Sequence, residues 1–351
     1  MASIKKPIVQ HPQSRANAIG LSIRDYEGSM STLCAGCGHD SITAAIVRAF
    51  YELGTPPHMI AKLSGIGCSS KTPTYFVGSA HGFNSAHGRM PPIATGAAAA
   101  NKELSYIGVS GDGDSLSIGL GHLAHAIRRN VNMLYLIENN GVYGLTKGQF
   151  SASADVGTKS KRGEANKQSP IDPVSLALGL GATFVARSFS GDKAQLVPLL
   201  KAGLAHRGFA IIDVISPCVT FNDHEGSTKS YLHTRKHLMQ MVRADFVPPA
   251  NEITAEYPAG TTTAVTLHDG SVVRLSKVAD GYDPTNRQAV QAELQRIHAK
   301  GEVATGLLYL DTKAVEMHQM SGTVDVPLTK IPYQKLCPGS AKLEALQNKY
   351  R

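Results

Sequence analysis

The sequence predicts an α/β fold built on a doubly wound, mainly parallel sheet. Short apolar runs rich in β-branched residues alternate with helical patterns between residues 40 and 218, as in a sheet that is buried on both faces. Polar and glycine-rich segments follow these runs, where such sheets bind their ligands. The 351 residues are 42% hydrophobic and 18% charged, which fits a packed globular protein and excludes a disordered chain or a coiled coil.

The predicted elements alternate along the chain. Strands are predicted over 58–64, 106–110, 133–138, 182–188 and 209–215. Helices are predicted over 41–53, 93–103, 115–129, 172–180 and 194–206. Because the connections are helical, consecutive strands should run parallel and end at one common edge of the sheet. Ligand-binding residues are therefore expected in the loops that follow the strands.

The two ends of the chain differ in sequence pattern from this central region. Residues 1–30 are polar and irregular and are expected to form an extended arm. Residues 226–351 are expected to form a small α+β extension of the domain that spans 31–225. Its expected elements are an amphipathic helix over 224–245, two strands around an Asp-Gly hairpin signal within 261–277, and a helix over 286–300 that precedes a polar tail.

Charge and cysteine content narrow the classes of function. The formal charge of +8 suits a nucleic acid, a phosphorylated cofactor or an acidic protein, although only 159–162 is densely basic and scattered surface charge explains the balance equally well. No apolar run reaches the ~18–20 residues of a membrane helix. Residues 1–30 lack the apolar core of a secretory signal, so we expect a cytoplasmic location. Five cysteines in such a chain favour metal ligation or catalysis over disulfides.

The strongest local signal is Gly-Asp-Gly-Asp at 111–114 after one predicted strand, followed by Asn-Asn-Gly-Val at 139–142 after the next. The glycines Gly111 and Gly113 allow a tight turn and a close approach of the backbone to a phosphate. The helix predicted from residue 115 then presents its free N–H groups to the same anion. An ordinary strand–turn–helix with an N-capping Asp is the alternative.

A cation fits the same two loops. The Asp112 carboxylate, the Asn140 amide oxygen and the Val142 carbonyl, with two diphosphate oxygens, would form an octahedral, all-oxygen site for Mg²⁺. Asp112 and Asn140 are 28 residues apart, the length of one helix and one strand, which places them at neighbouring strand ends. This spacing favours the metal site over the simple cap.

Four of the five cysteines could converge on a second site. Cys34 and Cys37 lie on a glycine-rich segment, and Cys68 and Cys218 each follow a predicted strand. Zinc and an iron–sulfur cluster both accept four thiolates. A Cys-x-x-Cys redox pair and unconnected buried thiols are the other interpretations. Cys337 lies in the polar tail and is expected to be a free structural thiol.

The Gly-Asp-Gly and Asn-Asn pattern is the thiamine diphosphate motif, and the sequence around it resembles the beta subunit of the 2-oxoacid:ferredoxin oxidoreductases over residues 30–225. The most telling stretches are Leu-Cys-Ala-Gly-Cys-Gly-His at 33–39, Gly-Ile-Gly-Cys-Ser-Ser-Lys at 65–71, Ala-His-Gly-Arg at 86–89 and Gly-Leu-Thr-Lys-Gly-Gln at 144–149. The long form with Leu-Thr-Lys-Gly-Gln is most similar to the 2-oxoglutarate-specific branch. Residues 250–351 contribute nothing to the resemblance.

The resemblance implies thiamine diphosphate, Mg²⁺ and a [4Fe–4S] cluster as cofactors. It makes Cys34, Cys37, Cys68 and Cys218 the cluster ligands, since electrons leaving a thiamine-bound carbanion need a one-electron acceptor and zinc has no redox chemistry. The implied cofactor contacts are Ile66, Gly67, Cys68, Ser69, His87, Gly113, Asp114, Gly144, Leu145 and Thr146. Lys71 and Lys147 match positions around the bound 2-oxoacid, where an ammonium can pair with a substrate carboxylate.

The implied function is the coenzyme A-dependent oxidative decarboxylation of a 2-oxoacid, first of all 2-oxoglutarate, to an acyl-CoA and CO₂, with ferredoxin as the electron acceptor. In the family the carboxylate that activates the aminopyrimidine comes from an alpha subunit, which implies an αβ or (αβ)₂ assembly. The charge of +8 suits an acidic ferredoxin, and no nucleic acid or membrane partner is expected. Pyruvate or branched 2-oxoacids, a non-redox thiamine-dependent decarboxylase or synthase, and a zinc-stapled nucleotide-binding module are the alternatives.

Overall fold

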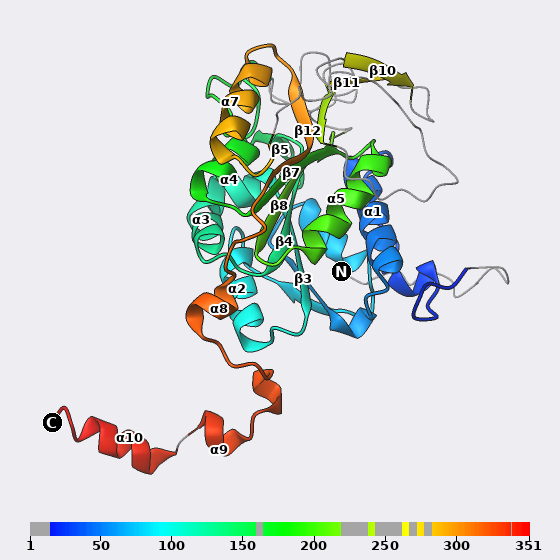
Figure 1. The fold of residues 1–351 in the computed structure, drawn as a ribbon. Coiled ribbons are helices and arrows are strands. Elements are labelled where there is room, and N and C mark those ends of the chain that lie inside the picture. Colours follow the sequence, from blue (N-terminus) through cyan, green and yellow to red (C-terminus); the bar gives the residue numbers. More distant parts are fainter. Residues whose placement is uncertain are drawn as a thin grey trace.

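An eight-stranded sheet with helices on both faces forms the body of the computed structural model (Figure 1). The structure describes residues 15–158, 164–218, 238–242, 262–266, 272–276, 283–337 and 339–351. The strand order is β2-β1-β3-β4-β8-β7-β12-β9, and every neighbouring pair is parallel except β12 and β7. The predicted doubly wound, mainly parallel fold is confirmed.

The five strands predicted between residues 58 and 215 are all present. They are β1 (Ile60–Ser64), β3 (Ser105–Gly111), β4 (Met133–Asn139), β7 (Phe184–Phe189) and β8 (Phe209–Ile215). Three further strands of the main sheet were not predicted: β2 (His81–Asn84), β9 (Leu238–Val242) and β12 (Val303–Leu310). Two small hairpins complete the inventory, β5 (Val142–Tyr143) with β6 (Gln149–Phe150), and β10 (Thr262–Thr266) with β11 (Val272–Ser276).

The central strands are apolar throughout because both of their faces are covered. In β4, Met133, Tyr135 and Ile137 pack into the core beneath α2 (Met90–Ala100), α3 (Leu120–Arg128), α4 (Pro173–Leu180) and α7 (Arg287–His298). Leu134 and Leu136 point the other way, into the core beneath α1 (Gly38–Leu53) and α5 (Lys193–Ala205). Side chains alternate across a strand, so one buried strand stabilises both layers. Each large apolar side chain so buried contributes about 1.5–3 kcal/mol.

The helix predicted over 115–129 is divided in the structure. A π-helical turn covers Gly113–Ile118, and α3 begins only at Leu120. Gly119 donates its N–H to Asp114 O at 2.9 Å, which closes the wide turn. A Cβ on Gly119 would lie 2.6 Å from that oxygen and 2.9 Å from Gly88 O, so the break requires glycine. Such π turns are frequent at functional sites.

The region after residue 225 differs from the prediction in part. The hairpin within 261–277 and the helix over 286–300 are confirmed as β10–β11 and α7. The helix over 224–245 is wrong where the structure describes the chain, because Leu238–Val242 is strand β9; the rest of that prediction lies outside the described residues. Pairing with β12 overrides the helical pattern of this segment.

The chain after α7 is more than a polar tail. Strand β12 joins the main sheet antiparallel to β7, so residues far apart in sequence share one sheet. The following helices are α8 (Met317–Ser321), α9 (Tyr333–Leu336) and α10 (Ser340–Gln347). In Figure 1, α9 and α10 extend away from the body. No helix among the described residues is both long and apolar enough to cross a membrane.

Short 3₁₀ turns connect the larger elements. They cover Ile23–Tyr26, Pro57–Met59, Ser69–Thr74 and Leu328–Lys330. The first lies in the segment expected as an N-terminal arm, and its Tyr26 is buried in the core beneath α1. Residues 15–30 therefore pack against the body in part, while 1–14 lie outside the described residues.

Candidate functional site

A pocket lies at the carboxyl ends of β1, β3 and β4, the edge where parallel sheets bind ligands. It encloses about 480 Å³ of space, its open mouth included. Thirteen of its lining residues are predicted metal or cofactor contacts: Ile66, Gly67, Cys68, Ser69, His87, Asp112, Gly113, Asp114, Asn140, Val142, Gly144, Leu145 and Thr146. The remaining lining residues are His39, Gly111, Glu138 and Tyr143. Four separate loops thus meet in one cavity.

Asp112 is buried between the loops that follow β3 and β4. Its Oδ2 accepts hydrogen bonds from Gly141 N (3.1 Å), from Ser153 Oγ (2.6 Å) and from Ser151 Oγ. From the part of the chain that the structure describes, its Oδ1 accepts one long contact, from Asn140 N at 3.4 Å. The predicted neighbourhood of Asp112 and Asn140 follows directly from the pairing of β3 with β4.

The acceptor set beside Asp112 suits a hard cation. Asn140 Oδ1 accepts the Val142 N–H at 3.1 Å. This bond holds the amide oxygen of Asn140 next to the Val142 backbone, inside the loop that follows β4. A carboxylate, an amide oxygen and a backbone carbonyl are the ligands that Mg²⁺ takes. The donor set therefore fits the metal that the sequence predicts.

Two glycines hold the backbone close to neighbouring side chains. A Cβ on Gly113 would lie 2.5 Å from Tyr143 Cε1, and a Cβ on Gly111 would lie 2.9 Å from Ser69 Oγ. Tyr143 also donates its hydroxyl to Gly113 O at 3.1 Å. Burial raises the pKa of Tyr143, so its hydroxyl remains a donor. No pattern in the sequence singles out Tyr143, because its contact with Gly113 joins the loops after two different strands.

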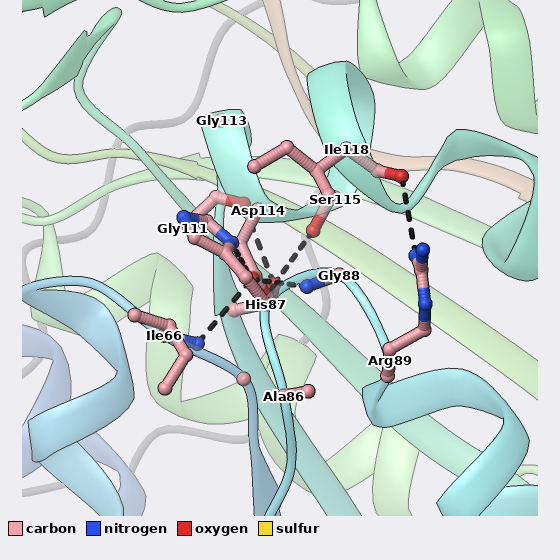
Figure 2. A network of polar contacts seen from close by, with 12 residues as sticks. Ile66, Ala86, His87, Gly88, Arg89, Gly111, Gly113, Asp114, Ser115 and Ile118 are labelled. Atoms are coloured by element: carbon pink, nitrogen blue, oxygen red, sulfur yellow. Dashed lines mark hydrogen bonds and ion pairs between the residues drawn. The ribbon is translucent and has the colours of Figure 1, made fainter.

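Asp114 ties three loops together (Figure 2). Its Oδ1 accepts hydrogen bonds from Gly88 N (2.6 Å), Ile66 N (3.3 Å) and His87 Nδ1. Its Oδ2 accepts the Ser110 hydroxyl at 2.6 Å. The carboxylate is buried and engaged by protein donors, so it fixes the positions of the turns around the pocket, and His87 is held in the pocket wall by this bond.

Of the four predicted cluster cysteines, Cys68 lines the pocket and Cys218 lies close to it. A Cβ on Gly144 would lie 3.5 Å from Cys68 Sγ and 3.9 Å from Cys218 Sγ, so both sulfurs flank the loop that follows β4. Burial raises the pKa of Cys68, and the nearby charges of Cys218 and Cys34 act in the same direction. Burial also raises the pKa of Cys37 to about 12, with Cys218 again among its neighbours.

These four thiols are a donor set that an iron–sulfur cluster or zinc accepts. Cys34 is exposed, whereas Cys37, Cys68 and Cys218 are half-buried. Among the described residues, no three His, Cys, Asp or Glu side chains are already in a metal-ligand arrangement. Cys337 is exposed and follows α9, which extends away from the body (Figure 1).

Two buried groups in the pocket wall were missed by the sequence analysis. His39 Nδ1 lies 2.6 Å from Ser216 Oγ and 3.5 Å from Glu138 Oε2. Burial lowers the pKa of His39 to about 4 and raises the pKa of Glu138 well above its usual value. The hydroxyl of Thr72 lies near the Glu138 carboxyl group. This hydroxyl donates its hydrogen to Ser69 O at 2.7 Å. Both ionisable groups therefore favour their neutral forms.

The two lysines predicted to contact the substrate do not line the pocket. Lys71 is half-buried in the 3₁₀ turn after β1, and its charge lowers the pKa of Cys68. Lys147 is exposed in the β5–β6 turn, where its φ of 80° is unusual for a residue with a side chain. Both lie on loops that border the pocket.

Comparisons with known proteins agree with this geometry. The family model for the thiamine pyrophosphate enzymes, C-terminal TPP binding domain, matches residues 65–214, which hold the pocket loops after β1, β2, β3 and β4. The fold and the site thus define a protein of the thiamine diphosphate-binding class.

Individual relatives narrow the class. Subunit KorB of a Mycobacterium tuberculosis 2-oxoglutarate oxidoreductase is 47% identical over 191 residues, 54% of this chain and 51% of the relative. Subunit KorB of a Methanocaldococcus jannaschii 2-oxoglutarate synthase is 36% identical over 190 residues, 54% of this chain and 69% of the relative. The chain belongs to the beta subunits of the 2-oxoacid:ferredoxin oxidoreductase family.

A solved structure extends the similarity beyond the aligned half. The 2-oxoglutarate:ferredoxin oxidoreductase from Magnetococcus marinus, solved with 2-oxoglutarate, coenzyme A and succinyl-CoA bound, matches with a TM-score of 0.71 and 29% identity. The match covers 93% of this chain and 96% of the other. The sequence alignment with the M. tuberculosis relative, by contrast, spans about half of that protein.

Proposed function

We propose that this chain is the thiamine diphosphate-binding subunit of an enzyme that oxidatively decarboxylates a 2-oxoacid, with coenzyme A as acyl acceptor and ferredoxin as electron acceptor. One observation carries the proposal. The pocket unites the oxygen acceptors Asp112 and Asn140 with the thiol of Cys68, and Cys218 lies beside the same loop. A metal–diphosphate site next to a thiol set is what thiamine chemistry coupled to electron exit requires.

In this proposal Asp112, Asn140 and the Val142 carbonyl hold Mg²⁺, and the turn at Gly113 receives the diphosphate. When bound, thiamine diphosphate supplies the stabilised carbanion that decarboxylation of a 2-oxoacid needs. The chain itself positions the anion with a helix-like turn, closes the site with Tyr143, and fixes three loops through Asp114.

Cys34, Cys37, Cys68 and Cys218 are the proposed ligands of a [4Fe–4S] cluster. A cluster accepts electrons one at a time, which zinc does not. The closeness of Cys68 and Cys218 to Gly144 supports an electron path that begins at the pocket. Cys337, on the extended C-terminal segment, has no part in it.

The proposed substrate is 2-oxoglutarate, with pyruvate and branched 2-oxoacids as the other members of the class. Two relatives and the similar solved structure carry 2-oxoglutarate in their names. Lys71 and Lys147 lie on loops that border the pocket, and the proposal gives their ammonium groups the role of pairing with a substrate carboxylate.

An alpha subunit is the proposed partner. Thiamine chemistry needs a carboxylate that activates the aminopyrimidine ring of the cofactor. No residue of this chain was predicted from the sequence to play that role, and in the family the alpha subunit supplies this carboxylate. The catalytic unit is then at least αβ, and (αβ)₂ is the expected assembly. The formal charge of +8 suits an acidic ferredoxin, because opposite charges raise encounter rates.

Anaerobic purification with and without the neighbouring alpha subunit tests the function. The αβ complex should be brown and should reduce a viologen dye in the presence of a 2-oxoacid and coenzyme A, fastest with 2-oxoglutarate. The beta chain alone should be brown but silent, since general acid–base help is worth about 10²–10⁴-fold. Asp112→Ala is the control that should abolish Mg²⁺-dependent binding of thiamine diphosphate. A colourless complex, or one that ignores every 2-oxoacid, would refute the proposal.

A further inference from the structure

We propose that Ser151 and Ser153 are positioning residues that hold one oxygen of Asp112 and reserve the other for the cation. The inference rests on the proposed function, in which the pocket binds Mg²⁺ together with thiamine diphosphate. It assigns a role to a buried polar chain that leads from Asp112 across the sheet to the start of α4.

The hydrogen bonds of Asp112 are divided unequally between its two oxygens. Oδ2 accepts from Gly141 N at 3.1 Å, from Ser153 Oγ at 2.6 Å and from Ser151 Oγ. Among the described residues, Oδ1 accepts only from Asn140 N, at the long distance of 3.4 Å. Three donors saturate Oδ2, so Oδ1 is the oxygen that remains for a metal ion.

The backbone of the serine loop is fixed from several sides. Ser151 N donates to Gly141 O at 3.2 Å, and Ala152 N donates to Ser117 Oγ at 3.1 Å. Ile171 N, just before α4, donates to Ala152 O at 2.7 Å. The loop therefore binds both the turn after β3 and the approach to α4, and the two hydroxyls have little freedom to leave Asp112.

A buried chain of polar side chains continues from Ser153 to the start of α4. Ser153 Oγ lies 2.8 Å from Asn139 Oδ1, and Asn139 Nδ2 donates to Asp213 Oδ1 at 3.0 Å. Asp213 Oδ2 accepts Arg187 Nε at 2.8 Å, and Arg187 also pairs with Asp172, the N-cap of α4. Because Asp213 accepts from the amide nitrogen, the Asn139 oxygen must face Ser153.

The single hydrogen of Ser153 can serve one acceptor at a time. Asp112 is charged and Asn139 is neutral, and charge-assisted hydrogen bonds are the stronger ones, so the hydrogen favours Asp112. Ser151 and Ser153 thus fix the Asp112 carboxylate in one orientation before any cation arrives. Groups that orient a metal ligand in this way typically change metal affinity 10–100-fold when they are removed.

The test is a titration of the αβ complex with Mg²⁺ at saturating thiamine diphosphate, in which calorimetry measures the binding. Ser151→Ala and Ser153→Ala should each raise the Kd for Mg²⁺ by about 10–100-fold. Ser153→Thr keeps the hydroxyl and should restore an affinity near that of the wild type. Ser188→Ala is the matched control, because Ser188 is equally buried but donates to Gln195 instead.

A second readout separates positioning from general loosening of the fold. The thermal midpoint of the metal-free complex should change no more in Ser153→Ala than in Ser188→Ala, while only the former weakens Mg²⁺ binding. The two serine variants are independent, so either one that folds decides the result. Unchanged Mg²⁺ affinity in a folded alanine variant overturns the inference, whereas a wild-type complex without Mg²⁺-dependent thiamine diphosphate binding overturns the proposed function.

Discussion

Asp114 Oδ1 accepts the backbone N–H of Gly88 at 2.6 Å, although the two residues follow different strands. The same oxygen accepts the N–H of Ile66, so one carboxylate fixes the loops after β1 and β2 to the turn after β3. All three segments line the pocket, so the shape of its wall depends on the Asp114 carboxylate.

The first prediction concerns this carboxylate. Asp114→Asn should destabilise the chain by about 1.5–3 kcal/mol for each charge-assisted hydrogen bond that it loses. It should also weaken binding of thiamine diphosphate, since the loop of Ile66 and the loop of His87 are no longer fixed. Chemical denaturation and calorimetry measure both effects. An unchanged free energy of unfolding would show that the three loops do not depend on Asp114.

A glycine pair offers a second prediction with its own control. Gly113→Ala should weaken thiamine diphosphate binding, because the new methyl group would lie 2.5 Å from the Tyr143 ring and displace it. Gly121→Ala should be neutral or stabilising by up to about 1 kcal/mol, because Gly121 lies in α3 with nothing within 4 Å of its Cβ position. Equal behaviour of the two variants would contradict the close fit at Gly113.

The third prediction concerns the cysteines. A [4Fe–4S] cluster brings about four irons per chain. Most of this iron should be lost when alanine replaces any one of the proposed ligands Cys34, Cys37, Cys68 and Cys218. The Cys337→Ala variant should keep its iron. Cys337 is the natural control because it is exposed on the extended C-terminal segment. Iron and sulfide analysis after anaerobic purification decides the matter. A complete cluster in Cys218→Ala would remove that residue from the ligand set.

Substrate choice gives the fourth prediction. If Lys71 or Lys147 pairs with the distal carboxylate of 2-oxoglutarate, its replacement by Met should lower kcat/KM for 2-oxoglutarate and spare 2-oxobutyrate. Loss of a charge-assisted hydrogen bond of about 1.5–3 kcal/mol corresponds to roughly a ten- to hundredfold effect. Equal losses on both substrates would mean that the lysine holds the carboxylate common to them or supports the loop.

The fifth prediction is a pH dependence of stability. Lys62 is buried in β1 and donates to Phe76 O at 2.6 Å and Val77 O at 2.8 Å. Burial lowers its pKa from 10.5 to about 8. Between pH 8 and 10.5 the unfolded chain therefore binds more protons than the folded chain, and stability rises with pH across this range.

Lys62→Met should remove this contribution. The difference in unfolding free energy between wild type and variant should change by about 3 kcal/mol from pH 8 to pH 10.5, in favour of the wild type at the higher pH. Denaturant titrations at both pH values measure it. Parallel pH profiles of the two proteins would show that Lys62 does not lose its proton within that range.

The central sheet and the position of the pocket could both be predicted from the sequence pattern. Apolar, β-branched runs such as 133–138 and 209–215 form strands because their local propensity and their burial favour the same conformation. The 28-residue spacing of Asp112 and Asn140 placed them together, since each follows a strand and the two strands are neighbours. The predicted metal ligands Asp112, Asn140 and Val142 line the pocket for that reason, whereas the predicted substrate contact Lys147 does not line it.

Which side chains meet across the sheet could be seen only in the folded chain. Tyr143 packs on Gly113, and Ser153 joins Asp112 to Asn139, through contacts that no spacing in the sequence encodes. Strand β9 lies where the sequence pattern predicts a helix, because pairing with β12 satisfies its backbone. Local propensity is a property of a segment alone, whereas register, edge pairing and buried hydrogen bonds depend on neighbours that only the folded chain brings together.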